Sequence, residues 1–226
     1  MNIQNNSITF TSRTKEIRMG YDVCHKINQE LTHQSPTKLY CMCENVGKRI
    51  GNSSRYSPER RVYRNGYRGY EQVSKKLNRM RALEKYSVDV STPYLKAKNV
   101  ISQFKEYKVA NCAENADVAA IILKMNGIDN ACSAAPENID HVFCVFNRDG
   151  SRFSGKVTRD TIIVDPLASI VDFASSALKR MKYMLSYCKE IKPHSSNSLT
   201  DIREINLSNS DILQLRKDFP ELVFQK

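Results

Sequence analysis

The sequence predicts an α+β fold in which a helix packs on a small antiparallel sheet, and three observations predict it. An apolar, alanine-rich segment over 112–125 has helical spacing and is stopped by Gly127, a residue type that often ends helices. Two short segments, 141–146 and 161–165, are rich in β-branched and aromatic residues and are separated by a turn-rich loop. Helical patterns lie on both sides of this pair, so helices should surround the sheet.

Several further helices are expected around this core. Apolar residues at a 3–4 spacing predict a helix over about 13–31, and an amphipathic pattern predicts a long helix over 168–191. Ser208 or Ser210 should cap a last short helix that ends before Pro220. Weaker helical patterns cover 39–50, 71–84 and 95–107, and 193–197 reads as a linker.

The chain should divide into two regions. Residues 1–94 form an N-terminal helical and basic region that we expect to serve in recognition, and residues 95–226 form the core with its C-terminal helices. Within the first region, 50–70 is rich in Gly, Ser, Arg and Tyr without a clear period. That composition is typical of a long mobile loop.

Length and composition indicate a folded protein without a membrane span. The 226 residues are enough for one good-sized core, and the apolar share of 41% is ordinary for a globular protein. No apolar run approaches the length of a transmembrane helix, and residues 1–10 lack the pattern of a secretory signal. We therefore expect a soluble protein without a cleaved export peptide, for which specialised secretion into a host cell stays open.

The seven cysteines predict a reducing compartment, because they cannot all pair and do not form a small-domain disulfide framework. Three of them lie among apolar neighbours and read as buried thiols: Cys132, Cys144 and Cys188. The Cys24-His25 dipeptide and the Cys41-x-Cys43 pair lack the C-x-x-C knuckle spacing of structural zinc sites. No metal site and no cofactor are expected.

Three residues carry the groups of a nucleophilic cysteine enzyme. Cys112 stands where the predicted helix begins, and the unpaired N–H groups and dipole of a helix start favour a negatively charged sulfur. Those N–H groups could also stabilise an oxyanion on a substrate. His141 and Asp165, at the edges of the two predicted strands, supply a base and a carboxylate that orients it.

Strand pairing should bring the base and the carboxylate together. Antiparallel pairing of His141 with Asp165 would leave 147–159 as the connecting loop and would place their Cβ atoms about 5 Å apart. Each of the three residues alone is more often structural than catalytic. Their order and their local contexts together favour catalysis.

These residues and their neighbours resemble the core of the transglutaminase-like superfamily. The matching stretches are Cys112-x-x-x-Ala116, Leu123, Gly127-Ile128, His141-Val142-Phe143 and Val164-Asp165-Pro166. The variant Asn111-Cys112-x-Glu114-x-Ala116 with Asp140-His141-Val142-Phe143 is similar to papain-like domains of bacterial effectors and toxins. The resemblance covers about 103–167, under a third of the chain. Unlike animal transglutaminases, the chain has no Trp and shows no calcium-site pattern.

The resemblance implies a papain/transglutaminase-like core and acyl transfer on protein amides. Cys112 would be the nucleophile, His141 the base and Asp165 the orienting group, and Asn111 or Gln103 could add a side-chain donor to the oxyanion site. Glutamine deamidation or transamidation through a thioester is the expected reaction, on a host protein and without a cofactor. Proteolysis of the papain type is the alternative.

The formal net charge of +11 is concentrated in one stretch, since residues 48–85 hold twelve basic and only three acidic side chains. Four arginines there alternate with tyrosines, as in surfaces that bind phosphates and stack on bases: Arg60, Arg61, Arg64 and Arg68. A solvated loop is our first interpretation, docking of an acidic protein or an anionic membrane the second, and nucleic acid the third. A non-catalytic basic binding module is therefore the rival of an enzyme.

Overall fold

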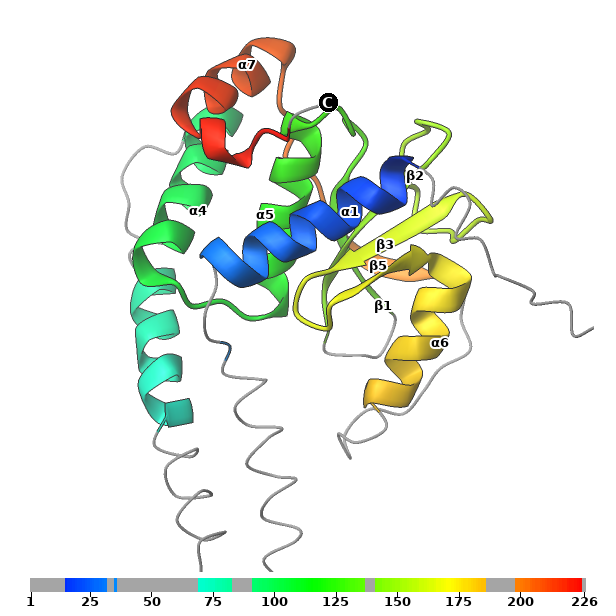
Figure 1. Ribbon diagram of the computed structural model, residues 1–226, viewed down its shortest axis with the longest axis horizontal. Coiled ribbons are helices and arrows are strands. Elements are labelled where there is room, and N and C mark those ends of the chain that lie inside the picture. The colour runs from blue at the N-terminus through cyan, green and yellow to red at the C-terminus, as the bar shows by residue number, and fades with distance from the viewer. Residues whose placement is uncertain are drawn as a thin grey trace, which may run out of the picture.

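The computed structural model describes residues 15–31, 35, 69–82, 91–136, 141–185 and 198–224, and it has the expected α+β class. Figure 1 shows one sheet with helices on both of its sides. The expected helix over 39–50, most of the expected loop over 50–70, and the linker over 193–197 lie outside the described ranges. Among the helices that are described, none is long and apolar enough to span a bilayer.

Five strands form one sheet, in the order β4-β3-β2-β1-β5, and every neighbouring pair is antiparallel. The strands are β1 (Cys132–Pro136), β2 (Phe143–Asn147), β3 (Thr161–Asp165), β4 (Ile170–Phe173) and β5 (Leu199–Arg203). The sequence pattern predicts β3 with its observed bounds and places the start of β2 two residues early. It does not predict β1, whose Cys-Ser-Ala-Ala-Pro sequence has little preference for strands, or β5, in which Asp201 interrupts Leu, Thr and Ile.

The register of β2 and β3 differs from the expected one by two residues. Cys144 pairs with Val164 and Asn147 pairs with Thr161, so the expected pairing of His141 with Asp165 is wrong. A shift of two residues keeps every side chain on its original face of the sheet, because side chains alternate with a period of two.

The expected helix over 168–191 is wrong at its start. Ile170–Phe173 form the edge strand β4, and helix α6 covers Ala174–Leu185. The side chains of Ile170 and Val171 pack on opposite faces of the sheet. Two adjacent apolar residues fit a strand buried on both faces as well as they fit a helix, and pairing with β3 decides between the two.

Helices α1 and α5 lie on one face of the sheet, with α4 and α7 packed outside α5 (Figure 1), while α6 covers the opposite face. The helices on the first face are α1 (Lys15–Lys26), α4 (Pro93–Tyr107), α5 (Cys112–Met125) and α7 (Asn209–Asp218). Helix α1 continues as the π-helical turn η1 (Ile27–Leu31), and α7 is followed by the short turn η2 (Pro220–Leu222). The first face buries even-numbered residues of β2 and β3, such as Cys144 and Val164, and the second buries odd-numbered ones, such as Val145 and Ile163.

Helix α1 belongs to this core although it falls within the expected recognition region 1–94. Its apolar face, with Ile17, Val23 and Cys24, joins the cluster that α5 and the sheet form. Gly20 allows the close approach, since a Cβ atom there would lie 2.6 Å from Cγ1 of Val171. Helix α1 is therefore packed directly on the strands.

The weak helical pattern over 71–84 is confirmed, because residues 69–82 are helical. One side of this helix, with Val73, Leu77 and Met80, packs against Tyr107 and Val109 at the end of α4. In Figure 1 it continues the line of α4 on the side away from α7. Arg81, near its end, pairs with Glu114 in the first turn of α5.

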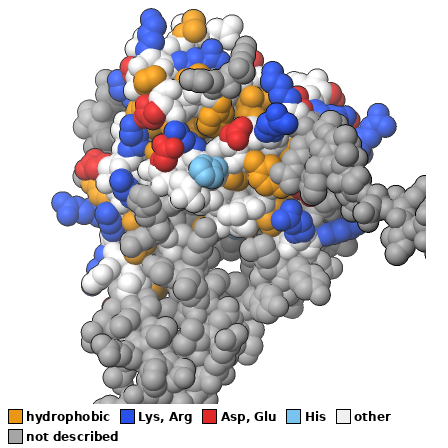
Figure 2. All heavy atoms as spheres, in the orientation of Figure 1, with side chains coloured by type: hydrophobic (Ala, Val, Ile, Leu, Met, Phe, Trp, Pro, Cys, Tyr) orange, Lys and Arg blue, Asp and Glu red, His pale blue; other side chains and the backbone are white. Residues whose placement is uncertain are grey.

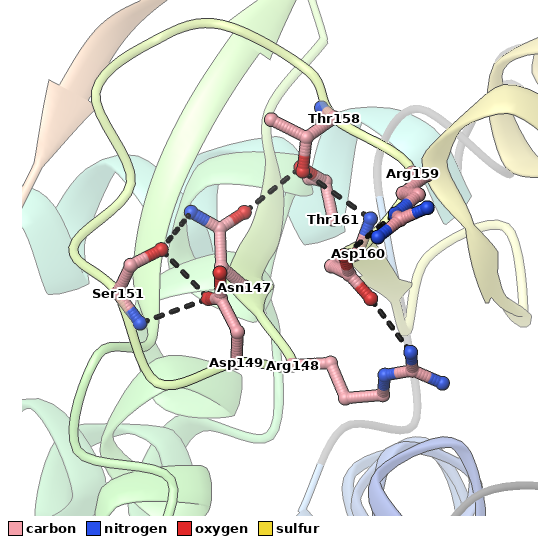
Figure 3. A network of polar contacts seen from close by, with 8 residues as sticks. All are labelled: Asn147, Arg148, Asp149, Ser151, Thr158, Arg159, Asp160 and Thr161. Carbon is pink, nitrogen blue, oxygen red and sulfur yellow. Dashed lines mark hydrogen bonds and ion pairs between the residues drawn. The ribbon is translucent and has the colours of Figure 1, made fainter.

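Polar side chains close the loop between β2 and β3 (Figure 3). Thr161 Oγ1 donates a hydrogen bond to Asn147 Oδ1 at 2.8 Å, and Asn147 Nδ2 donates to Ser151 Oγ at 3.1 Å. Arg148 pairs with Asp160 across the loop, with 2.7 Å between Nη2 and Oδ1. These contacts hold the two strands together at the end where Asn147 faces Thr161.

Candidate active site

Cys112 is the first residue of α5, as the sequence predicts, and its side chain is partly exposed. Asn111 has an extended backbone and acts as the N-cap residue. The N–H of Asn111 donates to Glu114 Oε2 at 2.9 Å, one arm of a capping box. This local arrangement fixes the residue at which the helix starts, and thereby the place of the thiol.

His141 lies two residues before β2 and is only 6% exposed. Its Nε2 is 2.7 Å from Oδ2 of Asp165. The ring also lies beside the Cys112 side chain, which acts to raise the pKa of His141. Because Nε2 is occupied by the carboxylate, Nδ1 is the ring nitrogen that remains for the sulfur.

Asp165 is fully buried at the end of β3. Both of its oxygens are engaged, since Oδ2 contacts His141 and Oδ1 accepts a hydrogen bond from the N–H of Ala168 at 3.0 Å. A carboxylate held at both oxygens cannot rotate freely. It therefore sets the orientation of the imidazole ring.

The pKa of His141 is raised to about 10. Burial of the ring acts to lower this pKa, but the hydrogen bonds to Asp165 and then to Cys112, with the negative charge of both partners, outweigh it. The ring is consequently an imidazolium at neutral pH. A positive charge next to a sulfur favours the thiolate, which is the nucleophilic form.

The two thiols in the sheet, Cys132 and Cys144, differ from Cys112 in their surroundings. Cys132 and Cys144 are fully buried, as the sequence predicts. Burial raises the pKa of Cys132 to about 12 and raises that of Cys144 well above its usual range. Both should be unreactive near neutral pH, so they are internal references for the reactivity of Cys112. Cys188 lies outside the described residues.

The structure thus brings Cys112, His141 and Asp165 together, and it places the two oxyanion candidates differently. Asn111 directly precedes Cys112, and its Oδ1 accepts a hydrogen bond from Ser35 Oγ at 3.5 Å. Gln103 is buried in α4, where its Nε2 donates to Asn99 of the preceding turn at 3.4 Å. The role of either residue at an oxyanion site stays a prediction.

The arginines proposed for partner binding, Arg60, Arg61, Arg64 and Arg68, lie outside the described residues. In the described part of the chain, Figure 2 shows lysine and arginine side chains dispersed over the visible face among acidic and apolar ones. The described residues therefore offer no test of a basic docking surface.

Two residues next to the site have almost no signal in the sequence. Asn28 donates its amide N–H to the carbonyl of Pro166 at 2.9 Å, and Arg81 pairs with Glu114 at 2.6 Å. The contacts join positions 138 and 33 residues apart. A polar residue at the edge of an apolar helix face, as Asn28 is, was the one available hint.

A pocket of about 460 Å³ lies at the other end of α5, between α1, Met125 and Phe224. Along the helix, the 14 residues of α5 separate it from Cys112, a distance of about 20 Å at 1.5 Å per residue. The triad therefore does not line this pocket.

Comparison of the chain with protein-family models, with curated proteins and with solved structures finds no match. The geometry of the site is consequently what a functional assignment has to build on.

Proposed function

We propose that the protein is a cysteine-dependent acyl-transfer enzyme that acts on protein amides, with Cys112, His141 and Asp165 as its catalytic residues. The observation that carries the proposal is the buried 2.7 Å contact of Asp165 with an imidazole that also lies beside Cys112 at the start of a helix. Buried ionisable pairs are costly, and a cysteine placed beside one has the environment of a nucleophile.

The reaction would proceed in two steps. The Cys112 thiolate attacks the carbonyl carbon of an amide, and backbone N–H groups at the start of α5 receive the oxyanion. The His141 imidazolium donates its proton to the leaving nitrogen, the C–N bond breaks, and a thioester remains on the sulfur. Neutral His141 then takes a proton from water or from an amine, which attacks the thioester, and the C–S bond breaks to release the Cys112 thiolate and leave His141 as the imidazolium.

Glutamine side chains are our preferred substrate. This choice follows from the resemblance to the transglutaminase-like superfamily and to papain-like bacterial effector domains, in which a helix with the cysteine precedes two strands with the histidine and the aspartate. The antiparallel neighbours β2 and β3 beside α5 are compatible with such a core. Deamidation uses water as the acceptor and transamidation uses an amine, and a host protein would be the substrate. Peptide-bond cleavage is the alternative reaction of the same triad.

The first test is selective alkylation by iodoacetamide at pH 7, read by peptide mass spectrometry. We expect Cys112 to react at least about tenfold faster than Cys132 and Cys144, because it alone of the three adjoins an imidazolium. His141→Ala should remove that advantage. Equal, slow labelling of all three would contradict the proposal and would favour a non-catalytic basic binding module.

The second test identifies the reaction. Candidate lysates treated with the wild type and with Cys112→Ala are compared by mass spectrometry of intact proteins and peptides. A gain of about 1 Da at glutamine indicates deamidation, loss of ammonia with crosslinking indicates transamidation, and new termini indicate proteolysis. A difference that persists with Cys112→Ala would exclude the cysteine as its cause.

A further inference from the structure

Both halves of the triad are contacted by segments that come much earlier in the chain. Asn28, in η1, contacts the turn that follows Asp165, and Arg81, in the helix over 69–82, contacts the first turn of α5. We infer that Asn28 and Arg81 are positioning residues, through which the N-terminal third of the protein holds the carboxylate and the thiol in place. This inference rests on the proposed function.

The contact of Asn28 is made to the turn that orients the carboxylate. Asp165 pairs with Ile170, so the turn between β3 and β4 begins directly after the catalytic carboxylate. Pro166 O accepts hydrogen bonds from Asn28 Nδ2 at 2.9 Å and from the N–H of Ser169 at 3.3 Å. The same turn presents the N–H of Ala168 to Asp165 Oδ1.

The backbone of this turn needs an external support. Ser169 has φ of 55°, in the left-handed region that is unfavourable for a residue with a side chain. Asn28 Nδ2 lies within 3.4 Å of Ser169 Oγ as well as bonding to Pro166 O. One amide therefore contacts both ends of a strained four-residue turn. Without it, the donor to Asp165 would lose its fixed place.

Close packing of α1 makes this support rigid. Gly20 lies against Val164 and Val171, the residues that flank the Asp165–Ile170 pair, and a Cβ atom there would be 2.9 Å from Cγ2 of Val164. Asn28 is two turns further along the same helical segment. The β3–β4 hairpin is thus held by α1 and η1 at its strands and at its turn.

The contact of Arg81 acts on the other half of the triad. Glu114 Oε2 accepts from the N–H of Asn111, and its Oε1 is 2.6 Å from Arg81 Nε. The two oxygens thus join the start of α5 to the helix over 69–82. Because Glu114 is mostly buried while Arg81 is about half exposed, the arginine fixes the carboxylate more than it stabilises the fold.

The test compares Asn28→Ala with Gln29→Ala, and Arg81→Met with Arg79→Met. Gln29 and Arg79 are exposed neighbours on the same helical segments and serve as matched controls. The rate at which iodoacetamide labels Cys112 should fall about tenfold in Asn28→Ala and several-fold in Arg81→Met, and should be unchanged in both controls. Arg81→Lys, which keeps the charge, should recover part of the loss.

The pH profile of labelling separates the two roles. His141 is faced by Asp165 and Cys112. Asn28→Ala loosens the carboxylate that stabilises the imidazolium, so the rise of Cys112 labelling with pH should lie at a higher pH than in the wild type. Arg81→Met leaves Asp165 in place and should lower the rate without moving the profile. A variant that only lowered the free energy of unfolding would neither slow Cys112 labelling in the folded protein nor shift its pH profile.

Labelling of Cys132 and Cys144 in the same samples reports loss of the fold. If Asn28→Ala and Arg81→Met label Cys112 at the rate of the wild type, the inference is wrong while the proposed function stands. If they label Cys132 and Cys144 as fast as Cys112, the residues are merely structural and the inference is also wrong. If wild-type Cys112 shows no advantage at all, the proposed function itself fails.

Discussion

The strands β2 and β3 end in buried polar pairs at both of their ends, but only one of these pairs can titrate. Near the loop, Thr161 is 0% and Asn147 6% exposed, and their side chains are joined at 2.8 Å. At the other end, Asp165 is 0% and His141 6% exposed, and their side chains are joined at 2.7 Å. The two pairs are equally buried and have nearly the same hydrogen-bond distance, but only His141 and Asp165 are ionisable.

The comparison bears on the proposed role of the His141–Asp165 pair. Neutral hydroxyl and amide groups are enough to close two strands at this degree of burial, as Thr161 and Asn147 do (Figure 3). Burying an ionisable pair costs more desolvation than burying a neutral one, and the attraction within the pair often does no more than offset that cost. In the described residues, no buried side-chain nitrogen or oxygen lacks a partner, so both ends are equally well satisfied. The ionisable pair lies where the thiol is, which favours a catalytic role.

Asp165→Asn should have the largest effect, because it replaces the ionisable pair at the His141 end of the two strands with a neutral pair, like the one at the Thr161 end. An amide cannot stabilise the imidazolium, so we expect labelling or turnover at Cys112 to fall by about 10²–10⁴-fold. The measurement is the iodoacetamide rate at pH 7, with Thr161→Val as the control at the opposite end. A rate that stays within twofold of the wild type would remove Asp165 from the triad.

Replacing both members, in His141→Gln/Asp165→Asn, should abolish the pH dependence that this pair contributes to stability. The folded-state pKa of His141 is raised to about 10. The charged pair therefore stabilises the fold fully below the unfolded pKa of about 6.5, and this contribution disappears as the pH rises to about 10.

The difference in the free energy of unfolding between the wild type and the double variant should therefore decrease as the pH rises through this window. The decrease should be at most about 1.4 kcal/mol for each pH unit. Urea unfolding at pH 6 to 10 measures it. A difference that is constant across these pH values would show that the pair does not titrate with folding.

Gly20→Ala should disturb the packing of α1 on β3 and β4, next to Asp165. Its Cβ atom would be 2.6 Å from Val171 and 2.9 Å from Val164, so we expect a loss of about 1–3 kcal/mol in the free energy of unfolding and slower labelling of Cys112. Gly69→Ala, where no atom lies within 4 Å of the added carbon, is the matched control. Equal stability of the two variants would refute the close packing of α1.

Thr161→Val should have the smallest effect and should be confined to stability. It leaves Asn147 Oδ1 without that donor and removes the acceptor of the Thr158 N–H, at a cost of about 1–2 kcal/mol. Labelling of Cys112 in the folded protein should be unchanged. Thr200→Val, an exposed position in β5, is the control and should be neutral. A marked loss of Cys112 reactivity in Thr161→Val would mean that the two ends are coupled.

Local chemistry made part of the fold and the site predictable. The alanine-rich run and Gly127 delimit α5 with its observed bounds, with Cys112 as its first residue. Ser208 caps α7, accepting from the N–H of Asp211 at 3.2 Å, and the β-branched run predicts β3 up to Asp165. Each of these features depends on residues within about four positions of one another. That His141 and Asp165 lie on the same side of the sheet also follows from strand alternation, which the two-residue error in register leaves intact. The place of Cys112 beside them depends on how α5 packs on β2 and β3.

The sequence by itself therefore determined where α5 and β3 begin and end, and which residue types stand at those points. The tertiary structure alone decided the strand state of β1, β4 and β5, the register of β2 on β3, and the contact of Asn28 with Pro166. The physical reason is the distance along the sequence between the residues that interact. Capping and apolar spacing act between near neighbours, whereas strand pairing and buried side-chain hydrogen bonds depend on partners that only the packed chain brings into contact.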